Sequence, residues 1–182
     1  MVKTVTVLLL TLCFAAPAFA QDDDYPRIET TFAYSNIDLD LGGMLPGRHS
    51  GFSNISGLNL FPWLGIENYM GYYGLGGQDT LGASVSLFSN TFGPRLTARS
   101  IGRIVPYFGA GLGVGYFSAG GGTIGGSNFA TRFGGGFDIP INDSISFKVD
   151  VGRLAVRTAS VTGQGWSSGT NITTGIVLNI GQ

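Results

Sequence analysis

The chain of 182 residues has ten lysine and arginine residues against eleven aspartate and glutamate residues, so its formal net charge of −1 at pH 7 gives no argument for binding nucleic acid. Its 31 glycines and the lack of a sustained 3.6-residue apolar period argue against a helical protein. After residue 20 no apolar run approaches the roughly 20 residues of a spanning helix, so a membrane location would have to be reached through strands.

Residues 1–20 have the features of a secretory signal peptide. Lys3 is their only charge, residues 5–16 are largely apolar, and Ala18-Phe19-Ala20 matches the small-x-small pattern of a cleavage site. We therefore expect 1–20 to be a cleaved signal and 21–182 to form one exported domain. Loss of Lys3 would leave nine basic against eleven acidic residues, a net charge of 9 − 11 = −2.

The residues near the start of the chain predict no cofactor and no metal. Cys13 is the only cysteine and lies in the expected signal, and Leu12 before it does not suit the small residue that lipoprotein cleavage needs. The mature chain would therefore lack disulfides and thiolate chemistry. Asp22, Asp23 and Asp24 could bind a divalent cation, but a solvated terminus is the commoner role of such a cluster.

Eight stretches alternate apolar with polar or glycine residues, which is the two-residue period of a β-strand. The clearest stretch is PYFGAGLGVGYF at 106–117, where an apolar face that includes Phe108 and Leu112 alternates with a face of glycines. About ten such residues, tilted near 45°, match the thickness of a bilayer. The predicted strands are 27–37, 51–61, 63–73, 83–99, 106–117, 128–139, 145–157 and 170–181.

The alternation assigns one face of each strand to lipid and the other to an interior, since charged side chains cannot face lipid. The phase predicts that arginine is badly tolerated at Leu112, whereas a small polar residue at Gly113 is accepted more readily. Arg153 falls on the lipid side, at a cost of about 2–4 kcal/mol near the midplane, which indicates either a bulge at Gly152 or a side chain that reaches the membrane rim. The predicted interior charges are Arg27, Glu29, Glu67, Arg95, Arg132, Asp138, Lys148 and Asp150.

These four positive and four negative groups can neutralise one another, and buried charges without partners cost several kcal/mol each. We therefore expect a structural network, with a pore lining as the alternative. The inward glycines leave room for long arginine and tyrosine side chains.

The predicted connections alternate between long and short. The long ones are 38–50, 74–82, 118–127 and 158–169, and the short ones are Pro62, 100–103 and 140–144. Such segregation is typical of transmembrane barrels with both termini on the side of the short turns. Two aromatic girdles are expected, one near the turns and one near the loops. The first comprises Phe61, Trp63, Tyr107 and Phe137, and the second Tyr72, Tyr116 and Phe129.

Several segments together resemble the OmpA/OmpX-type outer-membrane β-barrel domain family. They are YPRIETTFAYSNID, FPWLGIENYMGYYG, FGPRLTAR, VPYFGAGLGVGYF, FATRFGGGFDIPINDSISFKVDV and TTGIVLNIG. The resemblance covers essentially all of 25–182 and implies an eight-stranded antiparallel up-and-down transmembrane barrel in a Gram-negative-type outer membrane. It also implies contact with outer-membrane lipids and with the outer-membrane assembly machinery. The given sequence ends Ile180-Gly181-Gln182, where such barrels commonly have an aromatic residue, and we expect no peptidoglycan-binding domain after the barrel.

Three functions remain open at this point. The first is a non-enzymatic protein that presents loops, contributes to envelope integrity or surface interactions, and binds an extracellular ligand through the loops. The second is a narrow pore for small solutes or ions. The third, a lipid-modifying hydrolase, would need a nucleophile and a base. His49 is the only histidine and Ser50 follows it, but neighbouring side chains on an extended strand point apart, so no catalytic residue is predicted.

Overall fold

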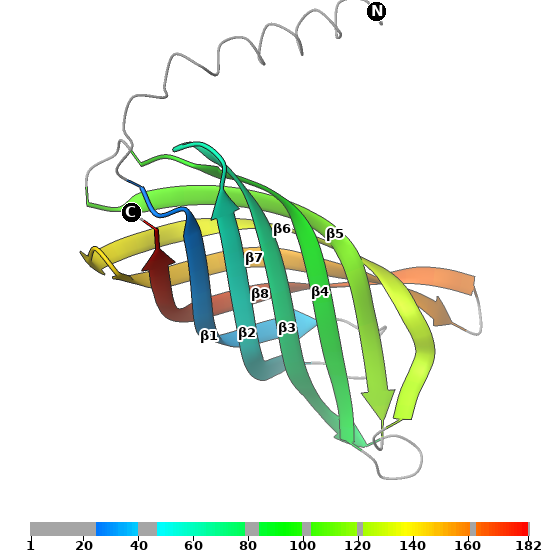
Figure 1. Ribbon diagram of the computed structural model, residues 1–182. Coiled ribbons are helices and arrows are strands. Elements are labelled where there is room, and N and C mark those ends of the chain that lie inside the picture. Colours follow the sequence, from blue (N-terminus) through cyan, green and yellow to red (C-terminus); the bar gives the residue numbers. More distant parts are fainter. Residues whose placement is uncertain are drawn as a thin grey trace, which may run out of the picture.

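The computed structural model describes residues 25–39, 47–78, 84–99, 103–119, 122–160 and 163–181. They form a closed barrel of eight antiparallel strands in sequence order, with the last strand paired to the first (Figure 1). The expected all-β, up-and-down barrel is confirmed. The expected signal peptide and Asp22 to Asp24 lie outside the described residues. The strands are β1 (Ile28–Leu39), β2 (Arg48–Asn59), β3 (Leu64–Gln78), β4 (Ser84–Thr97), β5 (Val105–Ala119), β6 (Gly122–Asn142), β7 (Ile145–Ser160) and β8 (Gly163–Ile180).

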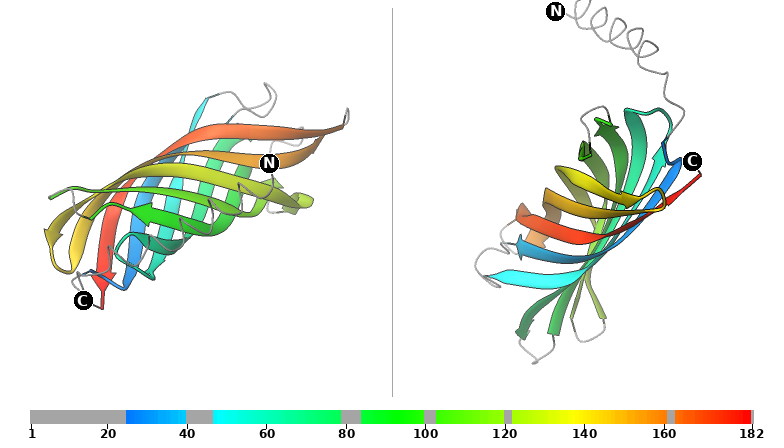
Figure 2. Two further views of the ribbon diagram at one scale, coloured as in Figure 1. Left: turned by 90° about the horizontal axis from the view of Figure 1, so that it is seen from above. Right: turned by 90° about the vertical axis from the view of Figure 1, so that its left-hand side faces the viewer.

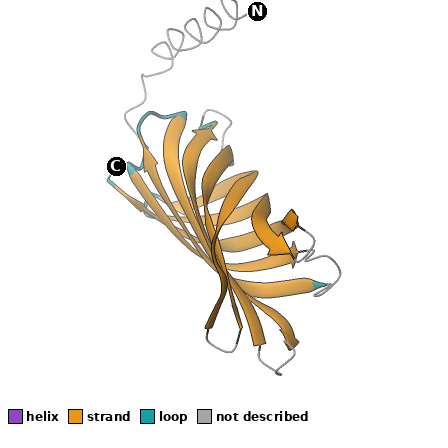
Figure 3. Ribbon diagram, turned by 90° about the vertical axis from the view of Figure 1, so that its right-hand side faces the viewer, coloured by secondary structure: helices purple, strands orange, loops and turns teal. Residues whose placement is uncertain are grey.

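The barrel has two distinct ends. We call the end where β2 joins β3, β4 joins β5 and β6 joins β7 the turn end, and β1 starts and β8 finishes there. The opposite end is the loop end. The strands are tilted around the barrel axis, and the described residues are drawn as strands with short connections (Figures 2 and 3). None of the described residues belongs to a helix long and apolar enough to cross a bilayer.

Side chains alternate strictly between the lumen and the outer surface. In β1, Glu29, Thr31 and Ser35 are buried, whereas Phe32 and Tyr34 are exposed. The outer face is a belt of large apolar residues, and Leu112 of β5 is 63% exposed. A water-soluble barrel would bury these groups, because each Å² of apolar surface left in water costs about 25 cal/mol. The belt is therefore suited to a hydrocarbon environment.

Several strands run further toward the loop end than the alternation predicts. Much of the predicted loops 74–82, 118–127 and 158–169 is strand, and in β7 and β8 Ser160 pairs with Gly163. The prediction was wrong there because a backbone ladder needs no apolar side chains, so glycine, serine and threonine continue it. His49, Ser50 and Trp166, expected in loops, lie in β2 and β8 for the same reason.

The expected bulge at Gly152 is wrong. Gly152 of β7 pairs in register with Gly134 of β6 and with Asn171 of β8. Arg153 therefore does face outward, and its Nη2 donates a hydrogen bond to Ser168 Oγ at 2.8 Å, toward the loop end. A register shift does occur in β3 between Gly74 and Gln78, where Gly76 has a φ of 62°, a backbone conformation that glycine adopts without a Cβ penalty.

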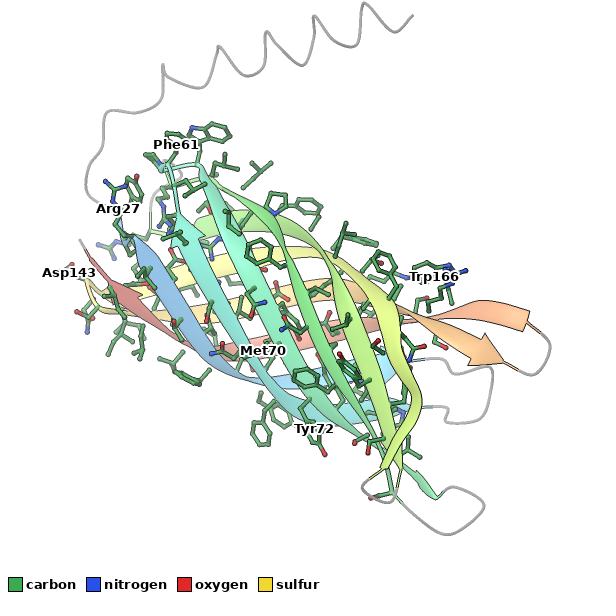
Figure 4. The ribbon with its side chains drawn as sticks, turned by 45° about the vertical axis from the view of Figure 1, so that its right-hand side comes forward. Arg27, Phe61, Met70, Tyr72, Asp143 and Trp166 are labelled. Carbon is green, nitrogen blue, oxygen red and sulfur yellow. The ribbon has the colours of Figure 1, made fainter. Side chains whose placement is uncertain are left out.

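Aromatic side chains lie near both ends of the barrel. In Figure 4, Phe61 lies at the turn end, and Tyr72 and Trp166 lie toward the opposite end. Phe61 stacks on Trp63 with ring centroids 6.1 Å apart, and Phe129 meets Trp166 edge to face at 6.1 Å. Tyr107, expected in the turn-side girdle, is instead buried in the lumen, because its odd position shares the inward phase of the β5 glycines.

The alternation predicts that Gly113 accepts a small side chain, but the neighbouring backbone would have to shift to make room for one. A Cβ at this position would lie 1.9 Å from the backbone oxygen of Asn90 on β4. The expectation of tolerance was wrong because facing the lumen does not by itself provide space when the neighbouring backbone is this close.

Candidate functional site in the barrel lumen

The first part of the lumen network joins β1 to β4 across the turn half of the barrel. Arg95 of β4 is 1% exposed and forms an ion pair with Glu29 of β1. Arg99, just after β4, places its Nη2 2.7 Å from the other Glu29 oxygen. Asn59 of β2 also donates to that oxygen at 2.9 Å. One buried carboxylate therefore holds two guanidinium groups from the far side of the barrel.

The second part joins β6 to β7 and is linked to the first by Glu67. Arg132 of β6 pairs with Asp150 of β7, which also accepts a hydrogen bond from the Tyr107 hydroxyl at 2.8 Å. Glu67 of β3 lies between the clusters, with one oxygen 3.7 Å from Arg132 Nη1 and the other 3.8 Å from Arg95 Nη1. The side chains thus form a chain of alternating charge across the lumen.

A third pair lies beside these clusters. Lys148 of β7 is fully buried, and its Nζ lies 2.7 Å and 2.9 Å from the two oxygens of Asp138 on β6. The same ammonium lies 4.0 Å from the centre of the Tyr107 ring. Arg132 lies over the Tyr69 ring at 4.1 Å. Cations at these distances are attracted by the ring faces, which adds to the carboxylate contacts.

Seven of the eight predicted lumen charges lie in this network, and Arg27 does not. Arg27 precedes β1, is exposed, and lies over the Tyr25 ring at 5.2 Å, because the strand alternation does not extend to it. Sequence reasoning missed Arg99, although its odd number continues the inward phase of Arg95 and Thr97. With Arg99 in place of Arg27, the network has four positive and four negative groups and remains neutral.

Glycines provide the space that the long side chains occupy. A Cβ on Gly152 would lie 2.8 Å from both Arg132 Nη2 and Asn171 Oδ1, and a Cβ on Gly57 would lie 3.2 Å from Arg95 Nη1. Alanine at either position would press on a guanidinium that is already held by a carboxylate.

Gly152→Ala is therefore expected to lower the free energy of unfolding by about 1–3 kcal/mol, since overpacking forces side chains out of their preferred positions. Urea unfolding in lipid vesicles measures the change. Gly74→Ala is the control, because the nearest atom to a Cβ there lies 4.0 Å away. Equal midpoints for the two variants would show that Arg132 is free to move aside.

Next to the ionic network, toward the loop end, lies a layer of hydroxyl and amide groups. Ser35 Oγ lies 2.6 Å from Ser53 Oγ and 2.7 Å from Thr173 Oγ1. The Tyr69 hydroxyl lies 2.6 Å from that of Tyr73 and accepts a hydrogen bond from Asn171 Nδ2 at 3.0 Å. These groups hydrogen-bond to one another within the lumen, as is usual for buried polar groups, although Asn171 Oδ1 has no hydrogen-bond partner among the described residues.

An apolar cluster fills the loop end of the lumen. Its members come from β1, β3, β4, β5, β6 and β7 and all are buried. Because they share the inward phase of the charged residues, the lumen changes from ionic at the turn end to apolar at the loop end. The cluster consists of Ile37, Leu39, Tyr73, Leu75, Leu87, Phe117, Ala130, Leu154 and Val156.

A small polar cavity remains beside the network. Its volume is about 10 Å³, space for about one water molecule, and Glu67, Tyr69, Thr91 and Arg132 contribute to its wall. Among the described residues, Glu67 Oε2 and Arg132 Nε have no hydrogen-bond partner. Asp138 Oδ1 likewise has no hydrogen-bond partner, but it lies 2.7 Å from Lys148 Nζ in an ion pair.

The only histidine and its neighbouring serine do not form a nucleophile pair. Ser50 accepts a hydrogen bond from the Tyr34 hydroxyl at 2.7 Å and donates one to Asn36 Oδ1 at 3.0 Å. His49 pairs in register with Ile37, whose side chain is buried in the lumen, whereas Ser50 is exposed. No group of three potential metal ligands is found among the residues that the structure describes.

Comparison with known proteins identifies the family. The family model of the outer membrane protein beta-barrel domain matches residues 6–179. The chain belongs to this family. The resemblance to OmpA/OmpX-type barrels is thereby confirmed, and with it an outer-membrane location surrounded by lipid. No curated protein sequence matches the chain significantly.

Solved outer-membrane barrels share the fold of this family member at low sequence identity. Neisserial surface protein A is 13% identical with a TM-score of 0.68, and the match covers 84% of this chain and 97% of that one. OprG from Pseudomonas aeruginosa is 11% identical with a TM-score of 0.57, covering 90% and 100%. AlkL, solved in lipid bilayers, is 13% identical with a TM-score of 0.55, covering 90% and 94%. These likenesses establish the fold alone.

Proposed function

We propose that this protein is a non-enzymatic outer-membrane barrel with a closed lumen, which presents its loop end to the outside and contributes to envelope integrity or surface interactions. The observation that carries the proposal is the filling of the lumen. Charged side chains cross the turn half, hydroxyl groups occupy the middle, and apolar side chains fill the loop end. A barrel of eight strands is just wide enough for side chains to fill, whereas aqueous channels appear at roughly sixteen strands.

We propose that the chain reaches the outer membrane by export and then by assisted insertion. Export would use residues 1–20 as a cleaved signal, and insertion would use the outer-membrane assembly machinery. The short connections and both ends of the barrel chain would then face the periplasm, as is usual for such barrels. An extracellular ligand would meet the connections at the loop end.

Single-channel recording in planar bilayers tests the closed lumen. We expect no stable, sizeable conductance from the intact protein, because a mobile ion would have to pass both the neutralised network and the apolar cluster. A large porin added to the same bilayers serves as the positive control that these conditions support insertion and conductance. Reproducible open steps from the intact barrel would contradict the proposal.

A narrow channel is the second candidate, and the polar cavity beside Glu67 and Arg132 favours it. If this cavity is part of a path, Glu67→Ala should alter ion selectivity while leaving stability unchanged. If the network is structural, the same change should destabilise the barrel and give no conductance. A lipid-modifying activity would become the better explanation only if the protein deacylated a lipid and His49→Ala abolished that reaction.

A further inference from the structure

The outer surface of β7 contains two arginines in a face that is otherwise apolar. From the turn end, the outward residues are Ile145, Phe147, Val149 and Val151, followed by Arg153, Ala155 and Arg157. Arg153 and Arg157 are both exposed and lie on the same face of the strand. A cation on a lipid-facing surface is costly near the midplane and cheap only near the interface.

The depth of these arginines places them at the loop-side interface. Arg153 lies eight residues beyond Ile145, about 26 Å along a strand that rises ~3.3 Å per residue, or about 20 Å along the axis at a tilt near 40°. Arg157 lies about 30 Å along the axis on the same reckoning. The apolar band of such barrels is about 25 Å tall, so the two guanidinium groups flank its upper boundary.

Neighbouring strands support this placement. Arg157 is in register with Trp166 of β8, which is 57% exposed and packs edge to face on Phe129. Tryptophan is enriched at the headgroup level of membranes. Arg153 donates to Ser168, which lies two residues from Trp166 on the same face, so its guanidinium reaches toward the headgroups. In Figure 4, Trp166 lies at the far end of the barrel from Phe61.

The chain supplies little negative charge near this patch. No aspartate or glutamate occurs in 100–137 or in 151–181, which include the loop halves of β6, β7 and β8. The nearest described carboxylate in this row is the exposed Asp38 of β1, which lies two strands from Arg153, because Thr170 of β8 is in register with both, and which faces Arg48 in register on β2. Among the described residues Arg153 has a hydroxyl partner but no carboxylate partner. The Arg153 guanidinium can therefore bind an anion at the membrane surface, and phosphate is the anion that its forked donors fit best.

We propose that Arg153 and Arg157, with Ser168 and Trp166 beside them, bind the phosphate of a lipid headgroup at the loop-end surface of the membrane. Lipid is favoured over a free anion because the patch continues directly into the apolar belt at Val151 and Ile172, which are in register and exposed. The acyl chains would lie along that belt while the phosphate meets the arginines. The site does not depend on whether the lumen conducts.

Trp166 provides the readout. The chain has two tryptophans, and Trp63 lies at the turn end, so Trp63→Phe leaves Trp166 as the only indole. The folded protein in uncharged maltoside micelles is titrated with dioctanoyl phosphatidic acid while Trp166 fluorescence is followed. We expect a saturable change that weakens with added salt, and no such change with dioctanoylglycerol, which lacks the phosphate.

The Arg153→Gln, Arg157→Gln double variant is expected to lose about thirtyfold in apparent affinity, and Arg157→Gln alone about fivefold. The charge-matched control is Arg48→Gln with Arg103→Gln, which removes two exposed cations outside the patch and should change the affinity by less than about twofold. Unchanged affinity in the Arg157→Gln variant, or an equal loss in the control, would overturn the proposal. Displacement of the lipid by inorganic phosphate at similar concentration and matched ionic strength would overturn the assignment to a lipid.

Discussion

Glu29→Ala is expected to destabilise the barrel by about 3–5 kcal/mol, because it leaves two buried cations without their main partner. Arg95 and Arg99 both contact this carboxylate, and Arg95 is almost completely buried. Glu67, the other carboxylate near Arg95, lies 3.8 Å away and also faces Arg132. It therefore cannot compensate fully for the loss of Glu29.

Arg27→Ala is the matched control for this prediction. Arg27 lies two residues from Glu29 but is exposed outside the network, so its loss should change stability by less than about 0.5 kcal/mol. Equilibrium urea unfolding in lipid vesicles compares the two variants. If Arg27→Ala cost as much as Glu29→Ala, the placement of the network would be wrong. The double variant Glu29→Ala, Arg95→Met should recover part of the loss, since both members of the pair are then removed.

Leu112→Arg is expected to lower the free energy of unfolding by about 2–4 kcal/mol and to impair insertion into vesicles. Leu112 lies near the middle of β5, is 63% exposed on the outer face, and pairs in register with Phe92 and Thr131. Arginine there would have to place its charge in hydrocarbon. Arg153 is native on the same outer surface because it lies nearer the loop-side boundary and has a hydroxyl partner.

Leu112→Ala separates the effect of charge from the loss of the leucine side chain. It removes apolar surface that faces lipid rather than a packed core, so the change should be well below that of Leu112→Arg. The shift of band mobility on unheated gels reports the folded fraction after insertion. An arginine variant that folded and inserted as well as the alanine variant would refute the outward assignment of Leu112.

The alternation of side chains predicted most of the fold because, in a closed barrel, successive residues of every strand face the lumen and the lipid in turn. Once Glu29, Arg132 and Lys148 were assigned to the interior, the remaining residues of each strand followed at every second position. The same rule could not locate strand ends. The strand pairing continues to Ser160 and Gly163, and neither residue type carries a sequence signal for lipid or lumen.

The lumen contacts were less predictable because they depend on side-chain reach between strands that are distant in sequence. The alternation gives Arg99 an inward direction, but nothing in the local pattern indicates that it reaches Glu29 or that Arg27 stays on the outside. Likewise, the alternation gives the direction of Gly113 but not the proximity of the Asn90 backbone, which depends on the local approach of β4 to β5. The direction in which a side chain points follows from its own strand, whereas the space available to it depends also on the neighbouring strand.

The cross-lumen charges also bear on how the barrel comes apart. Backbone pairing joins each strand only to its neighbours, so a barrel held by the ladder alone could fray one hairpin at a time. The ion pair of Arg95 with Glu29 spans 66 residues and joins β4 to β1, and Glu67 extends the connection from β3 to β6. If any one of these strands separated from the barrel, charged side chains on the opposite wall would lose their ion-pair partners. The strands should therefore unfold together, as a single cooperative unit.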